Sequence, residues 1–358
     1  MDFPRWNESL RSLPGYSFFH TSSWAEALHR SYGYRPFYFT VGEGGALSAL
    51  LPCMGINSAL TGKRGVCLPF TDYCEPLVSD AAQFQEMFAA AVAFGKRQSW
   101  RYLEFRGGER FFPDEEPSEW HYGHTLDLGE KGTALFSDST RAKNAGKRGQ
   151  AKTGTDLFPL FSDSNRRNIR KAEKQNLDVT ISASPDALQA FCRLNALTRR
   201  HHGLPPQPRR FFQCVYDRIL SKDMGFIVQA SLRGTPIAAN VYFMFGDQIL
   251  YKYGASDRTF QHLRASNLVM WEAIQWGCNR GFRSLCFGRT EPDNEGLRQF
   301  KAGWGARERL IKYYRFDLRK GAFIKTPMII NPLYRKIFGK LPIPVLNLLG
   351  SILYRHMG

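Results

Sequence analysis

The sequence lacks the cysteine spacing that binds zinc or builds a disulfide framework. No CxxC pair occurs, and the number of cysteines is odd, with most of them in apolar runs. This pattern favours buried free thiols in a reducing compartment and no bound metal. The seven cysteines are Cys53, Cys67, Cys74, Cys192, Cys214, Cys278 and Cys286.

Long apolar runs are also missing. No stretch reaches the roughly 18 apolar residues that a membrane-spanning helix needs, and the first ten residues, MDFPRWNESL, contain no apolar signal core. We therefore expect a cytoplasmic protein. Peripheral contact with the inner face of the membrane is the alternative left open by the C-terminal tail.

Negative charge is scarce relative to positive charge. The 358 residues include 49 Lys and Arg but only 32 Asp and Glu, which gives a net charge of +17. Such a balance favours anionic partners, namely nucleic acid, phosphorylated substrates or a lipid surface, without choosing among them. A hydrophobic content of 43% and an aromatic content of 14% are typical of a folded chain, here long enough for two domains.

An internal repeat is the clearest sign of organisation. The segments WRYLEFRGGE at 100–109 and FRSLCFGRTE at 282–291 match at a constant spacing, and each follows an amphipathic helix. Both halves show the same order of helix, hairpin, strand, helix and strand, which predicts a tandem duplication of the α/β (α+β) class. The expected hairpins are 37–41 with 47–51 and 226–231 with 237–243, and the expected later strands are 67–71, 103–106, 251–256 and 285–288.

The predicted domains are residues 1–128, a basic linker or insert at 129–164, residues 165–318, and a tail at 319–358. The linker carries five cations with no acid between them, and LFSDS occurs at both 135–139 and 160–164. We interpret the copies as a local duplication with little meaning for the fold. Residues 129–160 are expected to make few contacts and to be deletable at little cost in stability.

Two helices with clustered basic residues are candidates for binding. The helix expected at 165–175, capped by Ser162 or Ser164, presents Arg166 and Arg170 either to a phosphate or only to solvent. The helix at 187–202 ends in His201-His202. Because no third ligand is nearby, a polar cleft or a capping role for His202 is favoured over metal.

The tail contains a nearly continuous apolar segment, Leu341 to Tyr354, flanked by basic residues. It predicts either a helix packed on the core or an interfacial membrane helix, since fourteen residues are too few to span a bilayer.

The stretch 287–306, FGRTEPDNEGLRQFKAGWGA, is the best candidate for a site. It follows a short apolar strand, and Pro292, Asp293, Asn294 and Gly296 break that strand. Polar loops at the ends of buried strands are common places for ligand binding.

An ordered set of segments resembles the FemAB-related branch of the GNAT acyltransferase superfamily, with its BioF-like or FemAB-type acetyltransferase domain. The resemblance covers almost the whole chain except 129–160. The segments are CLPFTDYCEPL (67–77), RRNIRKAEK (166–174), TRRHHGLPPQP (198–208), IAANVYF (237–243), YKYGASD (251–257), NLVMWEAIQWG (267–277), the 287–306 stretch and YY (313–314).

The resemblance implies two tandem GNAT-like domains, each a mixed, mostly antiparallel sheet flanked by helices. It also implies N-acyl transfer without a tightly bound cofactor, from aminoacyl-tRNA or acyl-CoA, to an amine. The acceptor would be an anionic or lipid-linked precursor of peptidoglycan or exopolysaccharide. Acyl-CoA-binding members have glycines in a Q/R-x-x-G-x-G/A turn. The matching residues 261–266, QHLRAS, lack both glycines, which disfavours coenzyme A.

The family's Phe-Lys pair falls on Phe300-Lys301, so Lys301 is the candidate charge that stabilises the oxyanion. Asp293, Glu295 or Glu291 would accept the amine proton, directly or through water, and Tyr253 would provide a hydrogen bond. We expect 297–301 to form a short helix that places Lys301 in a cleft with Arg289 and either Asp293 or Glu295. The expected substrate-binding residues are Arg289, Asn294, Arg166, Arg170, His202, Arg64, Asp72 and Arg106. An acyl-CoA-dependent N-acetyltransferase of a sugar or amine and a non-catalytic RNA-binding protein remain alternatives.

Overall fold

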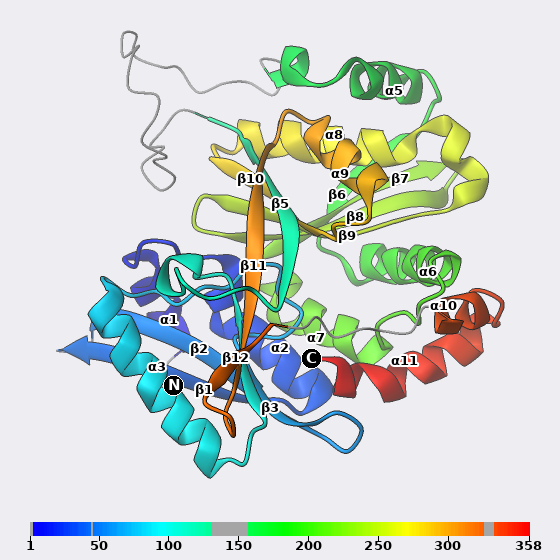
Figure 1. Ribbon diagram of the computed structural model, residues 1–358. Coiled ribbons are helices and arrows are strands. Elements are labelled where there is room, and N and C mark those ends of the chain that lie inside the picture. The colour runs from blue at the N-terminus through cyan, green and yellow to red at the C-terminus, as the bar shows by residue number, and fades with distance from the viewer. Residues whose placement is uncertain (1–2, 44–45, 130–156, 326–332) are drawn as a thin grey trace, which may run out of the picture.

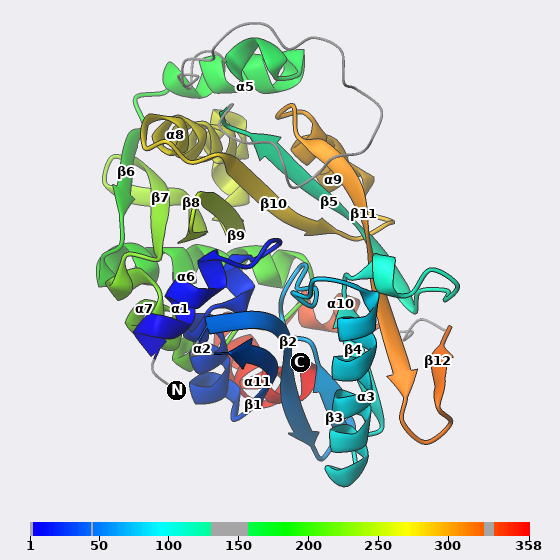
Figure 2. The same ribbon diagram turned by 90° about the vertical axis from the view of Figure 1, so that its left-hand side faces the viewer.

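The computed structural model describes residues 3–43, 46–129, 157–325 and 333–358. The described strands form one mixed sheet of twelve strands that runs through the molecule (Figures 1 and 2). The strands are β1 (Arg35–Glu43), β2 (Ala46–Ser58), β3 (Gly62–Val66), β4 (Tyr102–Arg106), β5 (Glu119–Asp127), β6 (Asp178–Ser182), β7 (Gly225–Leu232), β8 (Thr235–Phe245), β9 (Gln248–Ser256), β10 (Ser284–Thr290), β11 (Arg307–Asp317) and β12 (Ala322–Ile324).

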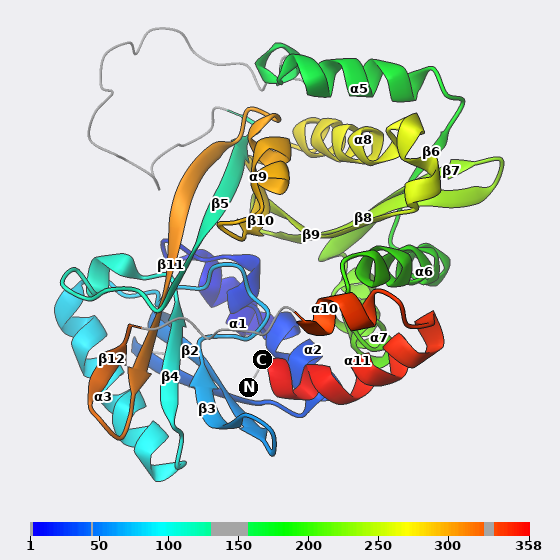
Figure 3. The same ribbon diagram turned by 45° about the vertical axis from the view of Figure 1, so that its right-hand side comes forward.

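The helices form layers on both faces of this sheet. Helices α5 and α8 stack over the part built by β7–β10, and α6 covers its opposite face (Figures 1 and 3). The helices are α1 (Phe3–Arg11), α2 (Ser22–Tyr32), α3 (Ala81–Arg97), α5 (Asp163–Glu173), α6 (Pro185–His201), α7 (Arg209–Arg218), α8 (Ala265–Asn279), α9 (Glu295–Ala302), α10 (Leu333–Phe338) and α11 (Ile343–Met357).

Short polar signals set the ends of these helices. The Thr21 hydroxyl accepts a hydrogen bond from Trp24 N–H at the start of α2, and Gly33 ends that helix with a φ of 76°. Ser162, one of the two predicted caps, accepts from Asn165 N–H and starts α5.

The two halves of the sheet have the same strand order, as the duplication predicts. The first half reads β1-β2-β3-β4-β11 and the second β7-β8-β9-β10-β5, with β6 added outside β7. In each half the third and fourth strands are parallel, and the other pairs of these sequences are antiparallel. The closing strand is exchanged, because β5 pairs with β10 and β11 pairs with β4.

Because of this exchange, the boundary between the two halves of the sheet does not coincide with a single point in the chain. Strand β5 precedes residue 128, where the sequence predicts a domain boundary, yet it completes the sheet of the second half. One hydrophobic core also joins the halves, since it contains Trp24 of α2, Phe211 of α7 and Phe243 of β8.

Two local expectations are wrong. Residues 67–71 are not a strand, because Leu68 and Phe70 adopt positive φ angles of 52° and 57°; the strand is β3, just before them. The end of the predicted linker is also structured. Leu157 and Phe161 are buried, and the Phe161 ring packs on Trp304. The remainder of that insert, 130–156, lies outside the described residues.

The second LFSDS copy therefore contributes to the core, which a stability measurement checks. Phe161→Ala should lower the free energy of unfolding by about 3–5 kcal/mol, because it removes a buried aromatic ring. Leu160→Ala, at the exposed neighbouring position, should change it by less than about 0.5 kcal/mol. Urea titrations of both variants measure the difference, and equal values would contradict this packing.

Candidate active site

A loop from the first half of the chain crosses into the second half. After β3, residues 67–77 lead to Asp72, whose carboxylate lies against Gly288 of β10; a Cβ there would be 3.1 Å from Asp72 Oδ2. Gly288, with a φ of 68°, permits this approach. Lys252 Nζ donates to Phe70 O over 2.7 Å, and the Tyr313 hydroxyl donates to Asp72 O over 2.8 Å.

The parallel strands β9 and β10 separate at this point. Only residues 248–250 of β9 pair with 284–286 of β10, although both strands continue beyond this pairing. Lys252 of β9 lies past the paired part, and its ammonium forms an ion pair with Asp72 over 3.2 Å. Charged side chains from both halves therefore meet where the two strands separate, Asp72 from the first half and Lys252 from the second.

Asp72 is ionised in this environment. Burial opposes ionisation, but the charges of Lys252, Arg289 and Lys301 outweigh it and lower the pKa of Asp72. Burial also lowers the pKa of Lys252, and Asp72 only partly offsets this because Arg289 and Arg106 add repulsion. The neighbouring cations therefore lower the pKa of Asp72 against the effect of burial, and they add to the effect of burial on the pKa of Lys252.

Lys301 reaches the same place from α9. Asn294 caps this helix by accepting from Leu297 N–H over 3.2 Å, and Phe300 packs edge-on against Trp304. The buried Lys301 ammonium donates to Arg289 O over 2.8 Å and Gly288 O over 3.3 Å. Burial lowers the pKa of Lys301 to about 8, against the attraction of Asp72.

Arg289 connects the cluster to solvent. Its guanidinium bonds to the Tyr313 hydroxyl over 3.0 Å and to His121 Nε2 over 3.1 Å, and pairs with Glu291 over 3.3 Å. Because 32% of its side chain is exposed, Arg289 is available to an incoming anion.

A second ionic network supports the crossing loop. Glu104 lies between Arg106 and Arg315, each 2.8 Å away, and Arg106 also donates to Thr71 O. Burial disfavours the charged carboxylate, but the two guanidinium groups lower the pKa of Glu104 to about 2.

The structure brings together four of the predicted residues, Lys301, Arg289, Asp72 and Arg106, with Phe300 anchoring α9. The acid near Lys301 is not the one expected. Asp293 and Glu295 are exposed at the start of α9, and Asn294 is used as its cap. The carboxylate that acts on Lys301 is Asp72.

The other predicted residues have different surroundings. Tyr253 borders the cluster, since the Lys252 ammonium is 5.6 Å from its ring centroid, but the ring packs among Phe191, Phe211 and Phe212 in the core. Arg64 is buried and donates to Gly358 O and His356 O at the end of the chain, so it is not available in the cluster. His202 is the exposed C-cap of α6.

Sequence reasoning missed three members of the cluster, Lys252, Tyr313 and His121. A lone lysine within the apolar strand at 248–256 was a usable signal for Lys252, because an isolated buried cation needs a partner. His121 had no comparable signal, since β5 reaches Arg289 only through the strand exchange.

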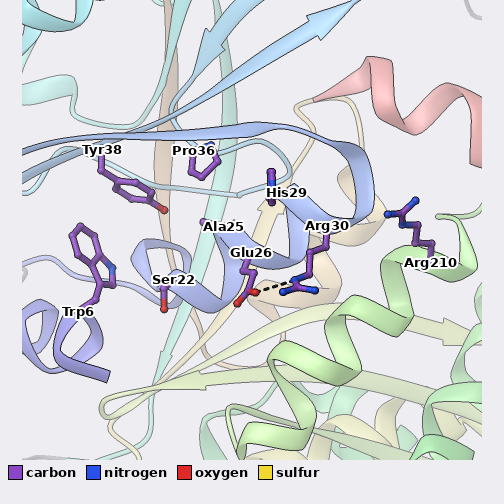
Figure 4. Close-up of a pocket in the computed structure, with 9 residues that line it drawn as sticks. All are labelled: Trp6, Ser22, Ala25, Glu26, His29, Arg30, Pro36, Tyr38 and Arg210. Atoms are coloured by element: carbon purple, nitrogen blue, oxygen red, sulfur yellow. Dashed lines mark hydrogen bonds and ion pairs between the residues drawn. The ribbon is translucent and has the colours of Figure 1, made fainter. Parts of the chain in front are cut away.

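Two cavities lie away from this cluster, and Lys301 lines neither. One, of about 470 Å³, lies between α1, α2 and β1 and is lined by Trp6, Tyr38, His29 and the Glu26–Arg30 pair (Figure 4). The other, of about 380 Å³, is at the start of α5 and contains the predicted Arg166 and Arg170.

The α5 cavity adjoins the turn that follows Lys301. Ser162 N–H donates to Gly303 O over 2.8 Å, which fixes the start of α5 to the end of α9. Arg170 lies over the Phe158 ring, and Arg166 pairs with Asp163.

Comparison with known families and sequences gives two findings. Residues 162–302 match the model of the acetyltransferase (GNAT) domain. Aminoacyltransferase FemA of Staphylococcus aureus is 31% identical over 105 residues, which are 28% of this chain and 23% of FemA. The matched part thus spans under a quarter of that relative.

Solved structures share the fold over nearly the whole chain. The crystal structure of FemX aligns with a TM-score of 0.67 at 13% identity, covering 94% of this chain and 98% of FemX. A tandem GNAT protein from the clavulanic acid biosynthesis pathway aligns with a TM-score of 0.50 at 12% identity, covering 88% and 94%. The expected fold of two tandem GNAT-like halves is confirmed.

The lowered pKa of Lys301 predicts a stability that depends on pH. Between about pH 8 and 10.5 the unfolded chain holds more protons at this lysine than the folded chain, so its contribution to the free energy of unfolding rises with pH. From about pH 7 to 10.5, the free energy of unfolding of the wild type should rise by on the order of 3 kcal/mol relative to that of Lys301→Met.

Urea titrations across this range test the prediction. Lys320→Met, at an exposed position, is the control and should keep a constant difference from wild type. A constant difference for Lys301→Met as well would show that the buried ammonium keeps its charge.

Proposed function

We propose, from the membership of this chain in the FemAB-type branch of the GNAT acyltransferase superfamily, that it transfers an aminoacyl group from aminoacyl-tRNA to an amine. The acceptor would be a precursor of the cell envelope, either of peptidoglycan or of exopolysaccharide. The FemA match, although short, is to an aminoacyltransferase and therefore favours this donor class.

The observation that carries the proposal is the charged cluster between the two halves. One carboxylate, Asp72, faces the ammonium groups of Lys252 and Lys301 where β9 and β10 separate. Acyl transfer to an amine needs a proton acceptor, orientation of both substrates and positive charge near the developing oxyanion. The cluster contains groups suited to each of these tasks.

The proposed steps assign one role to each group. The neutral amine attacks the acyl carbonyl carbon, and the Asp72 carboxylate takes up the proton that the amine loses. The charge of Lys301, held on the carbonyls of residues 288 and 289, stabilises the tetrahedral oxyanion. Collapse breaks the ester bond of the donor, and the proton that Asp72 took from the amine passes to the leaving oxygen as the new amide forms.

Arg289 is proposed to orient an anionic substrate. It is the partly exposed cation of the cluster, and its planar group can bind a carboxylate or phosphate with two hydrogen bonds. Tyr313 and His121 hold it in place from β11 and β5.

The surroundings of α8 favour a donor other than acyl-CoA. The turn before α8 lacks the glycines that let backbone N–H groups approach a pyrophosphate, and Arg264 there has a φ of 60°. The first turn of α8 is covered by α5, since Asn267 donates to Asn165 over 3.2 Å and both residues are buried.

A thermal-shift series tests the donor. Aminoacyl-tRNA should raise the melting temperature, because a ligand that binds only the folded state stabilises it, whereas coenzyme A and acetyl-CoA should not. A saturable shift with coenzyme A would support an N-acetyltransferase of a sugar or amine instead. Equal shifts with aminoacylated and deacylated tRNA, and no transfer to any amine, would support the RNA-binding alternative.

Substitution of the two central groups tests the mechanism. Lys301→Met should lower kcat by about 10²–10³-fold, because one oxyanion stabiliser is lost. Asp72→Asn should lower kcat/KM by about 10²–10⁴-fold, since it removes the proton acceptor. The same change breaks the ion pair with Lys252, so the activity is compared only after circular dichroism has shown the variant to be folded at the assay temperature. Transfer of the labelled aminoacyl group to an amine acceptor measures both values.

Matched controls lie on the same helix and just before its cap, Asn294. Arg298→Met removes a cation three residues from Lys301 that pairs with Glu308 at the surface, and Asp293→Asn removes the exposed acid. Both should retain turnover within about threefold. If Asp293→Asn lost activity and Asp72→Asn did not, Asp293 and not Asp72 would be the proton acceptor.

A further inference from the structure

Helix α11 is fixed to the rest of the molecule along one side. Tyr354 is buried, its hydroxyl bonds to Arg199, and its carbonyl accepts from the Tyr34 hydroxyl over 2.9 Å. Gly350 lies so close to Pro206 O that an added Cβ would be 2.1 Å away. The helix therefore has a fixed inner face, directed towards α2, α6 and β2.

The outer face of α11 is apolar and exposed. Val345, Leu348 and Ile352 follow one another at helical spacing, and Leu348 and Ile352 are 62% and 51% exposed. Ile337 of the neighbouring α10 is also exposed, and Figures 1 and 3 show both helices on the outside of the molecule. Because the inner face is already packed, the described residues offer no cover for this outer row.

The charge around this row has one sign. After Asp317 the sequence contains no Asp or Glu. Lys336, Lys340 and Arg355 are exposed at the two ends of the row. An apolar stripe whose own segment carries only positive charge matches the interface of a bilayer that contains anionic lipid, where apolar side chains enter the acyl boundary and cations meet the headgroups.

We propose that α10 and α11 form a membrane-docking face that binds an anionic lipid surface in its plane. No helix among the described residues is long and apolar enough to cross a membrane, which leaves binding parallel to the surface as the mode for α11. Docking goes beyond the transfer reaction and does not depend on it. It would bring the charged cluster close to any lipid-linked acceptor.

Vesicle sedimentation tests the docking with the full chain. The wild type should bind vesicles of phosphatidylcholine with phosphatidylglycerol, bind pure phosphatidylcholine weakly, and lose binding as salt rises. Leu348→Asn/Ile352→Asn should lower the partition constant at least about tenfold, because two side chains no longer enter the acyl boundary. Lys336→Ala/Lys340→Ala should lower it about fivefold per residue on the anionic vesicles alone.

The matched control removes two equally exposed aliphatic side chains from other surfaces. Leu160→Asn/Leu310→Asn changes residues that are 59% and 48% exposed, and it should bind vesicles as wild type does. Circular dichroism and the melting temperature confirm that each variant is folded. The proposal is overturned if Leu348→Asn/Ile352→Asn binds vesicles as well as Leu160→Asn/Leu310→Asn does. It is also overturned if the wild type does not bind anionic vesicles.

Light scattering distinguishes membrane docking from the alternative that a second copy of the chain covers the apolar row. A dimer that Leu348→Asn/Ile352→Asn dissociates, in a protein that does not bind vesicles, would assign the apolar row to self-association and overturn the proposal. Aminoacyl transfer in solution, measured with a soluble acceptor, is expected to be unchanged in this variant. Failure of the docking is thus distinguishable from failure of the proposed reaction.

Discussion

The ion pair between Asp72 and Lys252 is the interaction on which the arrangement of this molecule depends. It joins a loop of the first half to a strand of the second, and both groups are largely buried. Removing one partner of such a pair typically costs about 3–5 kcal/mol, because the other charge is left without compensation. Two hydrogen bonds that the second half donates to carbonyls of residues 70 and 72 fix the same loop.

The exchanged strands make the halves interdependent. Since β5 closes the sheet of the second half and β11 that of the first, neither half of the chain can complete its sheet alone. The shared core around Trp24 and Phe243 adds a continuous apolar contact between them. The candidate site lies where these constraints meet, so its geometry follows from the whole fold, not from one domain.

The electrostatic character of the site follows from the same geometry. Three cations, Lys252, Arg289 and Lys301, act on the single carboxylate of Asp72. Arg106 lies nearby and is paired with Glu104. The three cations keep Asp72 ionised, whereas burial is the main cause that lowers the pKa of Lys301 to about 8, with smaller contributions from Arg289 and Lys252. The excess of positive charge also suits an anionic substrate, in line with the net charge of the whole chain.

The sequence by itself determined the elements and their repetition. Periodicity, capping residues and turn residues act over a few positions. The hairpins, the equivalent strands β4 and β10 of the two halves, and the helix bearing Lys301 could therefore be predicted from the sequence. Tertiary structure alone decided which acid faces Lys301, that Arg64 binds the C-terminal end, and that Phe161 belongs to the core. These outcomes depend on contacts between residues far apart in the chain, and the exchange of β5 and β11, which creates several of them, leaves no local pattern to read.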